Sequence, residues 1–109
     1  MPKHKTAAES RHLERVAGLG CVLCRHLGRD YSPAQVHHLK EGQGLSQRAE
    51  HWLTIPLCPE CHTGANGLHG LGTRGFETRY KLTELDLLSM TIKALSESEE
   101  RRGFMADNA

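Results

Sequence analysis

The sequence has few of the side chains that build a hydrophobic core. Of its 109 residues, 38% are hydrophobic and 5% aromatic, with two Phe, two Tyr and one Trp. A chain of this length forms one small domain, and the apolar area that it buries roughly cancels the entropy lost on folding. We therefore expect a staple other than the core to stabilise the fold.

Signals for a membrane or for export are missing as well. No run of about 18 apolar residues occurs, so no membrane span is expected. The polar start around Lys3 and Lys5 is followed by no apolar segment, so the sequence gives no secretory signal. We expect a cytoplasmic and therefore reducing location.

Charge of one sign is also scarce. The net charge of +1 argues against binding of nucleic acid through bulk charge. The charges are unevenly placed, with six basic and three acidic side chains in residues 1–30 and three basic and six acidic in residues 83–109. We therefore expect a polyanion to bind the N-terminal part of the chain.

Cysteine, by contrast, is present in two closely spaced pairs, Cys21 with Cys24 and Cys58 with Cys61. Two intervening residues let both thiolates of one tight turn occupy corners of a tetrahedron, and four thiolates favour zinc. Residues 25–57 separate the two pairs. This separation is longer than in a compact zinc ribbon, which has about 15–20 residues there, so a segment is inserted between the pairs. A reducing location disfavours disulfides. The alternatives are two unrelated cysteine pairs or a redox site, but no thioredoxin-like pattern surrounds the cysteines. A structural zinc would supply the missing stability.

Histidine is the second abundant ligand type, and six of the eight histidines lie between positions 26 and 69. His37 and His38 are adjacent within the insert, and His62 directly follows Cys61. A single His beside a zinc site is more often a surface residue, but the adjacent pair favours a functional cluster. Neighbouring strand residues face opposite sides, so one site includes both His37 and His38 only if the strand bends or bulges.

Two amphipathic helices are predicted outside the cysteine pairs. The segment TAAE at 6–9 has the form of a capping box and predicts a helix over about 7–17. The segment TELD at 83–86 repeats that signal and predicts a helix over about 84–96. The apolar stripe of this second helix is predicted to consist of Leu85, Leu88, Ile92 and Leu95. The charged tail over about 97–109 is expected to fray.

Between these helices the pattern is that of a loop-rich segment with short strands. Strands are expected at 36–39 and at 53–55, the second ended by Pro56. A short helix is expected within 58–66, with Pro59 in its first turn. The fold class predicted is therefore α+β.

These motifs, in this order, carry a resemblance to a known family. The segments CVLC at 21–24, VHHL at 36–39 and IPLCPECH at 55–62 resemble HNH (His-Me finger) endonucleases of the four-cysteine zinc type. The segments GLHG at 67–70 and GF at 75–76 are similar to phage recombination-enhancement (Ref-like) nucleases. The likeness spans about residues 21–76. It implies a single zinc-stapled ββα-metal domain over 1–109, in which a bent hairpin carrying the His pair packs on a short helix.

The resemblance also implies the roles of individual residues. His37 and His62 would bind a catalytic divalent metal, Mg²⁺, Mn²⁺ or Zn²⁺, and His38 would be the general base. For a third ligand, His69 and Asn66 compete, and the likeness reaches His69. The role of general base suits histidine, because a neutral imidazole with a pKa of about 6.5 can take a proton from water at physiological pH.

Other positions are less defined by the pattern. The family usually has Asn or Asp ahead of the cysteine helix, where this sequence has His51, which either orients the base or is a surface residue. Lys40, Arg48 and Arg74 flank the expected site and are candidates for contacts with phosphates.

The sequence therefore predicts a metal-dependent endonuclease that hydrolyses phosphodiester bonds in single- or double-stranded DNA. A role in phage or prophage recombination or DNA processing is expected, as a monomer or dimer, with recombination or phage packaging proteins as possible partners. The alternative is a non-catalytic, zinc-stabilised module that binds nucleic acid or protein. The missing Asn or Asp and the low net charge favour that alternative.

Overall fold

The structure is a computed structural model that describes residues 5–39 and 50–107. Two antiparallel strands and flanking helices form these segments, which confirms the predicted α+β class. The elements in chain order are α1 (Ala7–Gly18), α2 (Val22–His26), β1 (Gln35–His38), β2 (Thr54–Leu57), α3 (Pro59–His62), α4 (Leu68–Tyr80) and α5 (Glu84–Asp107). The order β1, β2, α3 gives the ββα unit, and the cysteine cluster lies beside it.

The strands pair with Val36 opposite Pro56 and His37 opposite Ile55. The expectation that Pro56 ends the second strand is wrong, because β2 runs through it to Leu57. Each strand of a two-stranded sheet has one edge without a partner, so a proline whose nitrogen faces that edge loses no ladder hydrogen bond. The sheet is thereby long enough to carry the chain directly into the second cysteine pair.

The predicted capping box starts α1. The Glu9 amide donates to Thr6 Oγ1 at 3.1 Å, and the Thr6 amide donates to Glu9 Oε1 at 2.9 Å. The chain turns after α1 at Gly20, whose φ is 78°. A Cβ at Gly20 would lie 2.5 Å from the ring of Tyr31, so glycine is required there by both backbone and space.

Each cysteine pair opens a short helix. Cys21 is the N-cap of α2 and Cys58 is the N-cap of α3, with Pro59 in the first turn of α3 as predicted. The helix α2 was not predicted, because five residues are too few to show a periodic apolar pattern. The helix α4 was also missed, because its glycines hide a helical pattern that is interrupted at Gly72, where φ is 75°.

The helix α5 begins where the TELD segment predicts, but it is longer than predicted and buries a different face. Beyond the predicted helix end near residue 96, α5 continues to Asp107 through a segment rich in Glu and Arg. The predicted apolar stripe is partly wrong, because Leu85 and Ile92 are 54% and 56% exposed. The buried face instead holds Leu88 together with Glu84, Leu87 and Thr91.

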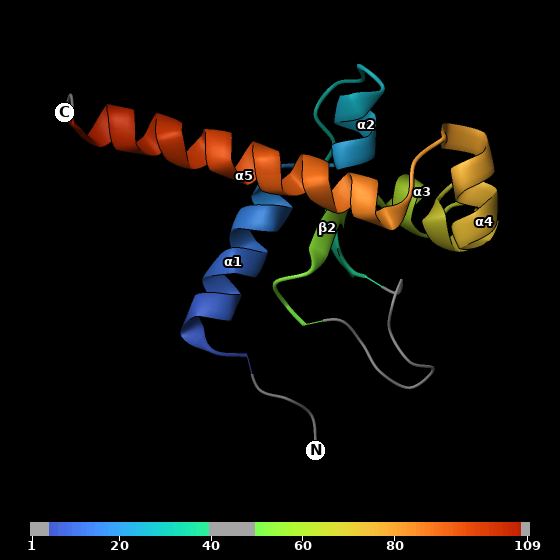
Figure 1. Ribbon diagram of the computed structural model, residues 1–109, viewed down its shortest axis with the longest axis horizontal. Helices are drawn as coiled ribbons and strands as arrows, with labels where there is room; N and C mark the ends of the chain where they lie inside the picture. Colours follow the sequence, from blue (N-terminus) through green and yellow to red (C-terminus); the bar gives the residue numbers. More distant parts are fainter. Residues whose placement is uncertain (1–4, 40–49, 108–109) are drawn as a thin grey trace.

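Figure 1 shows α5, in orange and red, crossing the molecule beside β2, with α1 and α2 on its two sides and its C-terminal half extending beyond them. Arg15 of α1 and Glu99 of α5 form an ion pair of 3.1 Å. The core joins the four cysteines to buried side chains from α2, β2, α4 and α5, among them Ile55, Phe76 and Leu87. In the described segments, no helix combines the length and the apolar character that a membrane span requires.

Candidate active site

The four cysteines form one buried cluster, with exposed fractions from 3% for Cys21 to 7% for Cys58. Their sulfur atoms lie within 4.8 Å of one another. Cys24 Sγ is 3.8 Å from both Cys58 Sγ and Cys61 Sγ, far beyond the about 2.05 Å of a disulfide bond. Thiolates about 2.3 Å from a central zinc would be about 3.8 Å apart at tetrahedral angles. The cluster therefore fits a tetrahedral metal site.

Burial and hydrogen bonds act differently on the individual thiols. Burial raises the pKa of the Cys61 thiol, and the neighbouring thiols act in the same direction. Burial also acts to raise the pKa of Cys24, but hydrogen bonds from groups that include Ser32 and Arg29 outweigh it, so that pKa is lowered. A metal bound here would have to displace the proton of Cys61, so its affinity would fall as the pH falls.

Three histidines form a second cluster, and it draws on β1, α3 and α4. His37 Nδ1 lies 3.2 Å from His62 Nε2, which in turn lies 3.1 Å from His69 Nε2. His37 is 3% exposed, His62 is half-buried and His69 is exposed. Two nitrogens each about 2.1 Å from one ion would be about 3 Å apart at a right angle, so this set also fits a metal. Its outermost member faces solvent.

The innermost histidine has a carboxylate partner from α5. His37 Nε2 lies 2.6 Å from Glu84 Oε2, and both side chains are almost fully buried. The outer ring nitrogen of His62, Nδ1, lies 2.9 Å from Gln35 Oε1. Thus two of the three imidazoles contact the cluster with one nitrogen and a protein oxygen with the other.

His38 is not a member of this cluster. Its Nε2 lies 3.0 Å from Nδ1 of His51, which belongs to the turn before β2. That turn is held by Thr54, whose hydroxyl donates to the His51 carbonyl at 3.1 Å. The sequence left open whether His51 orients the base or lies on the surface. In the structure, His51 contacts His38. No bulge is needed, because the adjacent residues His37 and His38 reach different partners.

The loop that joins the second and third cluster histidines is packed backbone against backbone. A Cβ at Gly67 would lie 2.5 Å from the Glu60 carbonyl oxygen and 2.6 Å from the Cys61 carbonyl carbon. A Cβ at Gly70 would lie 2.1 Å from the Gly64 carbonyl oxygen. Only glycine permits these approaches, and they place His69 next to His62.

The remaining candidate residues lie elsewhere. Arg74 is exposed on α4, the helix that carries His69. The Asn66 carbonyl accepts a hydrogen bond from the Tyr80 hydroxyl at 2.8 Å. Lys40 and Arg48 lie outside the described residues.

The comparison with protein families gives one result for this combination of clusters. Residues 5–96 match the family described as recombination enhancement, RecA-dependent nuclease. The chain belongs to this family. No curated protein and no solved structure matched the chain. The predicted likeness to recombination-enhancement nucleases is therefore confirmed, and the match extends beyond the motif into α5.

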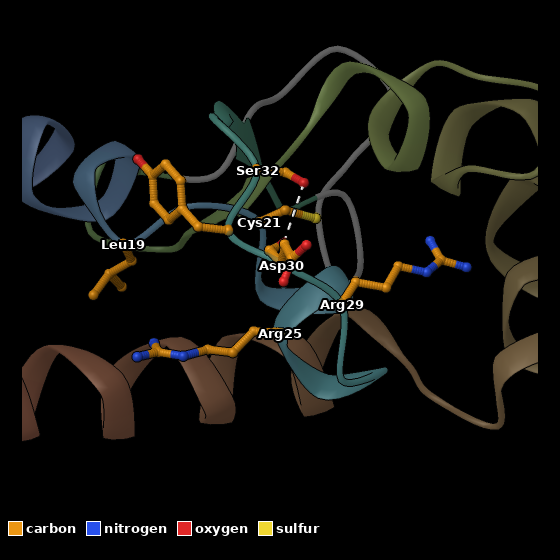
Figure 2. A pocket seen from close by; sticks show the side chains of 7 residues that line it. Leu19, Cys21, Arg25, Arg29, Asp30 and Ser32 are labelled. Atoms are coloured by element: carbon orange, nitrogen blue, oxygen red, sulfur yellow. Dashed lines mark hydrogen bonds between the residues drawn. The ribbon is translucent and has the colours of Figure 1, made fainter.

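Two arginines near the cysteine cluster, Arg25 and Arg29, do not point toward a common centre (Figure 2). Arg25 and Arg29 line a hollow of about 260 Å³ together with Leu19, Cys21, Asp30, Tyr31 and Ser32. Figure 2 shows the two arginine side chains extending in opposite directions. A hydrogen bond with Cys24 raises the pKa of Arg29. Four thiolates around a Zn²⁺ ion would carry a net charge of about −2, part of which Arg29 would offset.

Sequence reasoning missed two residues that contact the histidine cluster, Gln35 and Glu84. Gln35 directly precedes the strand segment that carries the His pair, and alternation along β1 would have placed it on the same side as His37. Glu84 gave no such signal. It stands at a helix start, where an acidic residue is ordinarily explained by the helix dipole.

Proposed function

We propose that this protein is a metal-dependent endonuclease of the HNH type that hydrolyses DNA phosphodiester bonds. The observation that carries the proposal is the pair of histidine groups on consecutive residues. His37 joins His62 and His69 in a set that fits a metal, and His38 contacts His51. The family match supports a nuclease, and the two groups supply the parts that hydrolysis needs.

The cysteine cluster would hold a structural zinc, and His37, His62 and His69 would hold a second divalent ion, Mg²⁺, Mn²⁺ or Zn²⁺. Three protein ligands leave positions for substrate, and the exposure of His69 gives that substrate access. Such an ion would polarise a phosphate oxygen and stabilise the charge on the leaving 3′ oxygen.

His38 would act as the general base that takes the proton from the attacking water. In one tautomer its Nε2–H donates to His51 Nδ1, which places the basic nitrogen at Nδ1 of His38. His51 would therefore orient the base, as the Asn or Asp of related enzymes does. Attacking and leaving oxygens lie on opposite sides of the phosphorus, so a base outside the metal cluster suits an in-line displacement.

The substrate is proposed to be DNA that RecA has bound, because the family is described as a RecA-dependent nuclease. The net charge of +1 gives the chain little long-range attraction for bare DNA. A partner that presents the strand would compensate for that deficit. Arg74, on the helix that begins beside His69, is proposed as a phosphate contact, together with Lys40 and Arg48.

The direct test is cleavage of plasmid and single-stranded DNA, bare and RecA-coated, with Mg²⁺, Mn²⁺ or Zn²⁺ supplied separately. His38→Ala is expected to lower the rate by about 10²–10⁴, the usual contribution of general base catalysis. The matched control is His26→Ala, which removes an exposed histidine of α2 and is expected to cleave at the wild-type rate. Wild-type protein that cleaves no faster than His38→Ala under every condition would instead identify a zinc-stabilised binding module.

A further inference from the structure

Glu84 is buried although α5 does not need it as a cap. Thr83 and Asp86 make the capping box, with the Thr83 amide donating to Asp86 Oδ2 at 2.9 Å and the Asp86 amide donating to Thr83 Oγ1 at 3.1 Å. Burial removes a carboxylate from water at a large cost in hydration, so a buried carboxylate is normally paired and hydrogen-bonded. The position of Glu84 therefore points to its partner, His37.

The carboxylate of Glu84 defines which nitrogen of His37 carries the proton. An ionised carboxylate only accepts hydrogen bonds, so at 2.6 Å His37 Nε2 is the donor. A neutral imidazole has one N–H, so the lone pair of His37 then lies on Nδ1. Nδ1 is the atom that faces His62 in the histidine cluster.

Gln35 acts on His62 in the same sense. Its amide oxygen accepts from His62 Nδ1 at 2.9 Å, which leaves the lone pair of His62 on Nε2. His37 Nδ1 and His62 Nε2 are then two acceptors that face each other at 3.2 Å. Two such lone pairs repel unless a cation lies between them. Both oxygen partners thus prepare the nitrogens to hold a positive ion.

We propose that Glu84 is a positioning residue that fixes His37 as a metal ligand through Nδ1. This role rests on the metal site proposed above and adds a residue outside the motif. A carboxylate behind a ligating histidine fixes the ring and makes its free nitrogen more basic, and loss of such a partner lowers metal affinity about 10–100-fold. Because both side chains are almost fully buried, their contact restricts the orientation of the His37 ring.

The first measurement is Mn²⁺ binding by calorimetry to the full chain with zinc on the cysteines. Glu84→Ala is expected to weaken Mn²⁺ binding about 10–100-fold. Glu84→Gln keeps the shape and an acceptor oxygen but loses the charge, so a smaller, severalfold loss is expected. The matched control is Asp86→Asn, which removes a carboxylate from the same helical turn and is expected to bind Mn²⁺ like the wild type.

The second measurement is the tautomer of His37, read from nitrogen-15 NMR of the protein without Mn²⁺. The wild type is expected to show the proton on Nε2, and Glu84→Ala a mixture of both tautomers. A proton on Nδ1 in the wild type, or Mn²⁺ affinity in Glu84→Gln equal to that of the wild type, overturns the proposal. Glu84→Gln is isosteric and decides the question even where the Ala variant fails to fold.

These readouts separate this proposal from that of the nuclease reaction, because Mn²⁺ binding needs no DNA. Protein that binds Mn²⁺ in a Glu84-dependent way but cleaves no DNA refutes the proposed function and supports this one. Protein that cleaves DNA with a Mn²⁺ affinity insensitive to Glu84 does the reverse. Wild-type protein that binds no Mn²⁺ refutes the role of Glu84.

Discussion

The cysteine cluster and the histidine cluster share α3, where Cys61 and His62 are consecutive residues, yet the two clusters differ in their exposure to solvent. All four cysteines are buried. The three histidines pass from buried His37 to exposed His69. Four ligands close a tetrahedron, whereas three leave room for a substrate. A single helical turn therefore connects a fully buried cluster to one that reaches the surface.

This difference implies that the two clusters answer differently to the loss of a ligand. A structural metal contributes its binding free energy to folding, about 10–16 kcal/mol for zinc-finger peptides. That is comparable to the whole stability of a typical domain, about 5–15 kcal/mol. An exposed histidine contributes little to folding, since surface substitutions usually change stability by about 0.5 kcal/mol or less.

The largest effect is therefore expected for Cys58→Ser compared with His69→Ala. Cys58→Ser should lose zinc and unfold, as followed by circular dichroism and metal content. His69→Ala should keep one zinc per chain and a wild-type melting temperature, while its Mn²⁺ binding is weakened. The contrast between the clusters fails if Cys58→Ser keeps its melting temperature or if His69→Ala loses the zinc.

A second variant tests the link between the clusters. In Gly67→Ala the new methyl group would meet the backbone of Glu60 and Cys61, so both the cysteine turn and the approach to His69 must shift. Overpacking of this kind costs about 1–3 kcal/mol. Chemical denaturation should show that loss, and Mn²⁺ binding should weaken with it.

The control for this variant is Gly18→Ala, where a Cβ meets nothing within 4 Å at the end of α1. It should leave Mn²⁺ binding unchanged and stabilise the fold by up to about 1 kcal/mol. Equal effects of the two substitutions would mean that the close contacts at Gly67 do not join the clusters.

The smallest effect concerns pH and a histidine outside both clusters. Burial lowers the pKa of His12, with help from the charge of Arg15, although a backbone hydrogen bond with Trp52 acts the other way. In the unfolded chain His12 has its ordinary pKa of about 6.5, so below that pH the unfolded chain binds more protons than the folded chain. The free energy of unfolding should therefore fall as the pH drops through about 6.5.

His12→Gln should reduce this acid sensitivity slightly, as measured by thermal unfolding of metal-loaded protein at pH 7.5 and 5.5. The residual sensitivity would then belong to the metal ligands. If His12→Gln and the wild type lose the same stability on acidification, His12 makes no contribution.

Local patterns made much of this site predictable. The two-residue gaps of the cysteine pairs and the place of His62 directly after Cys61 are fixed by covalent spacing, and the structure brings these residues together. The family likeness reached His69, but the path to it depends on glycines whose backbone contacts no local rule specifies. The contact between His38 and His51 was left open because it spans a turn of unknown shape.

Glu84 shows where such prediction stops. The leucine pattern of α5 was assigned to a face that includes Leu85 and Ile92, and this placed Glu84 outside the core. The face that is buried is shifted by about one residue from the predicted face, so that Leu87 and Glu84 are both buried. Which face of a helix is buried depends on the elements that it meets, here β2 and α2, and not on the helix alone.

The buried pair of His37 and Glu84 has a consequence for any attempt to shorten this chain. A fragment ending at residue 76, where the recognisable motif ends, would retain every cysteine and histidine of both clusters. It would lack the carboxylate behind His37 and the helix that covers β2. The smallest unit worth engineering is therefore defined by what reaches the innermost ligand, and it extends into α5.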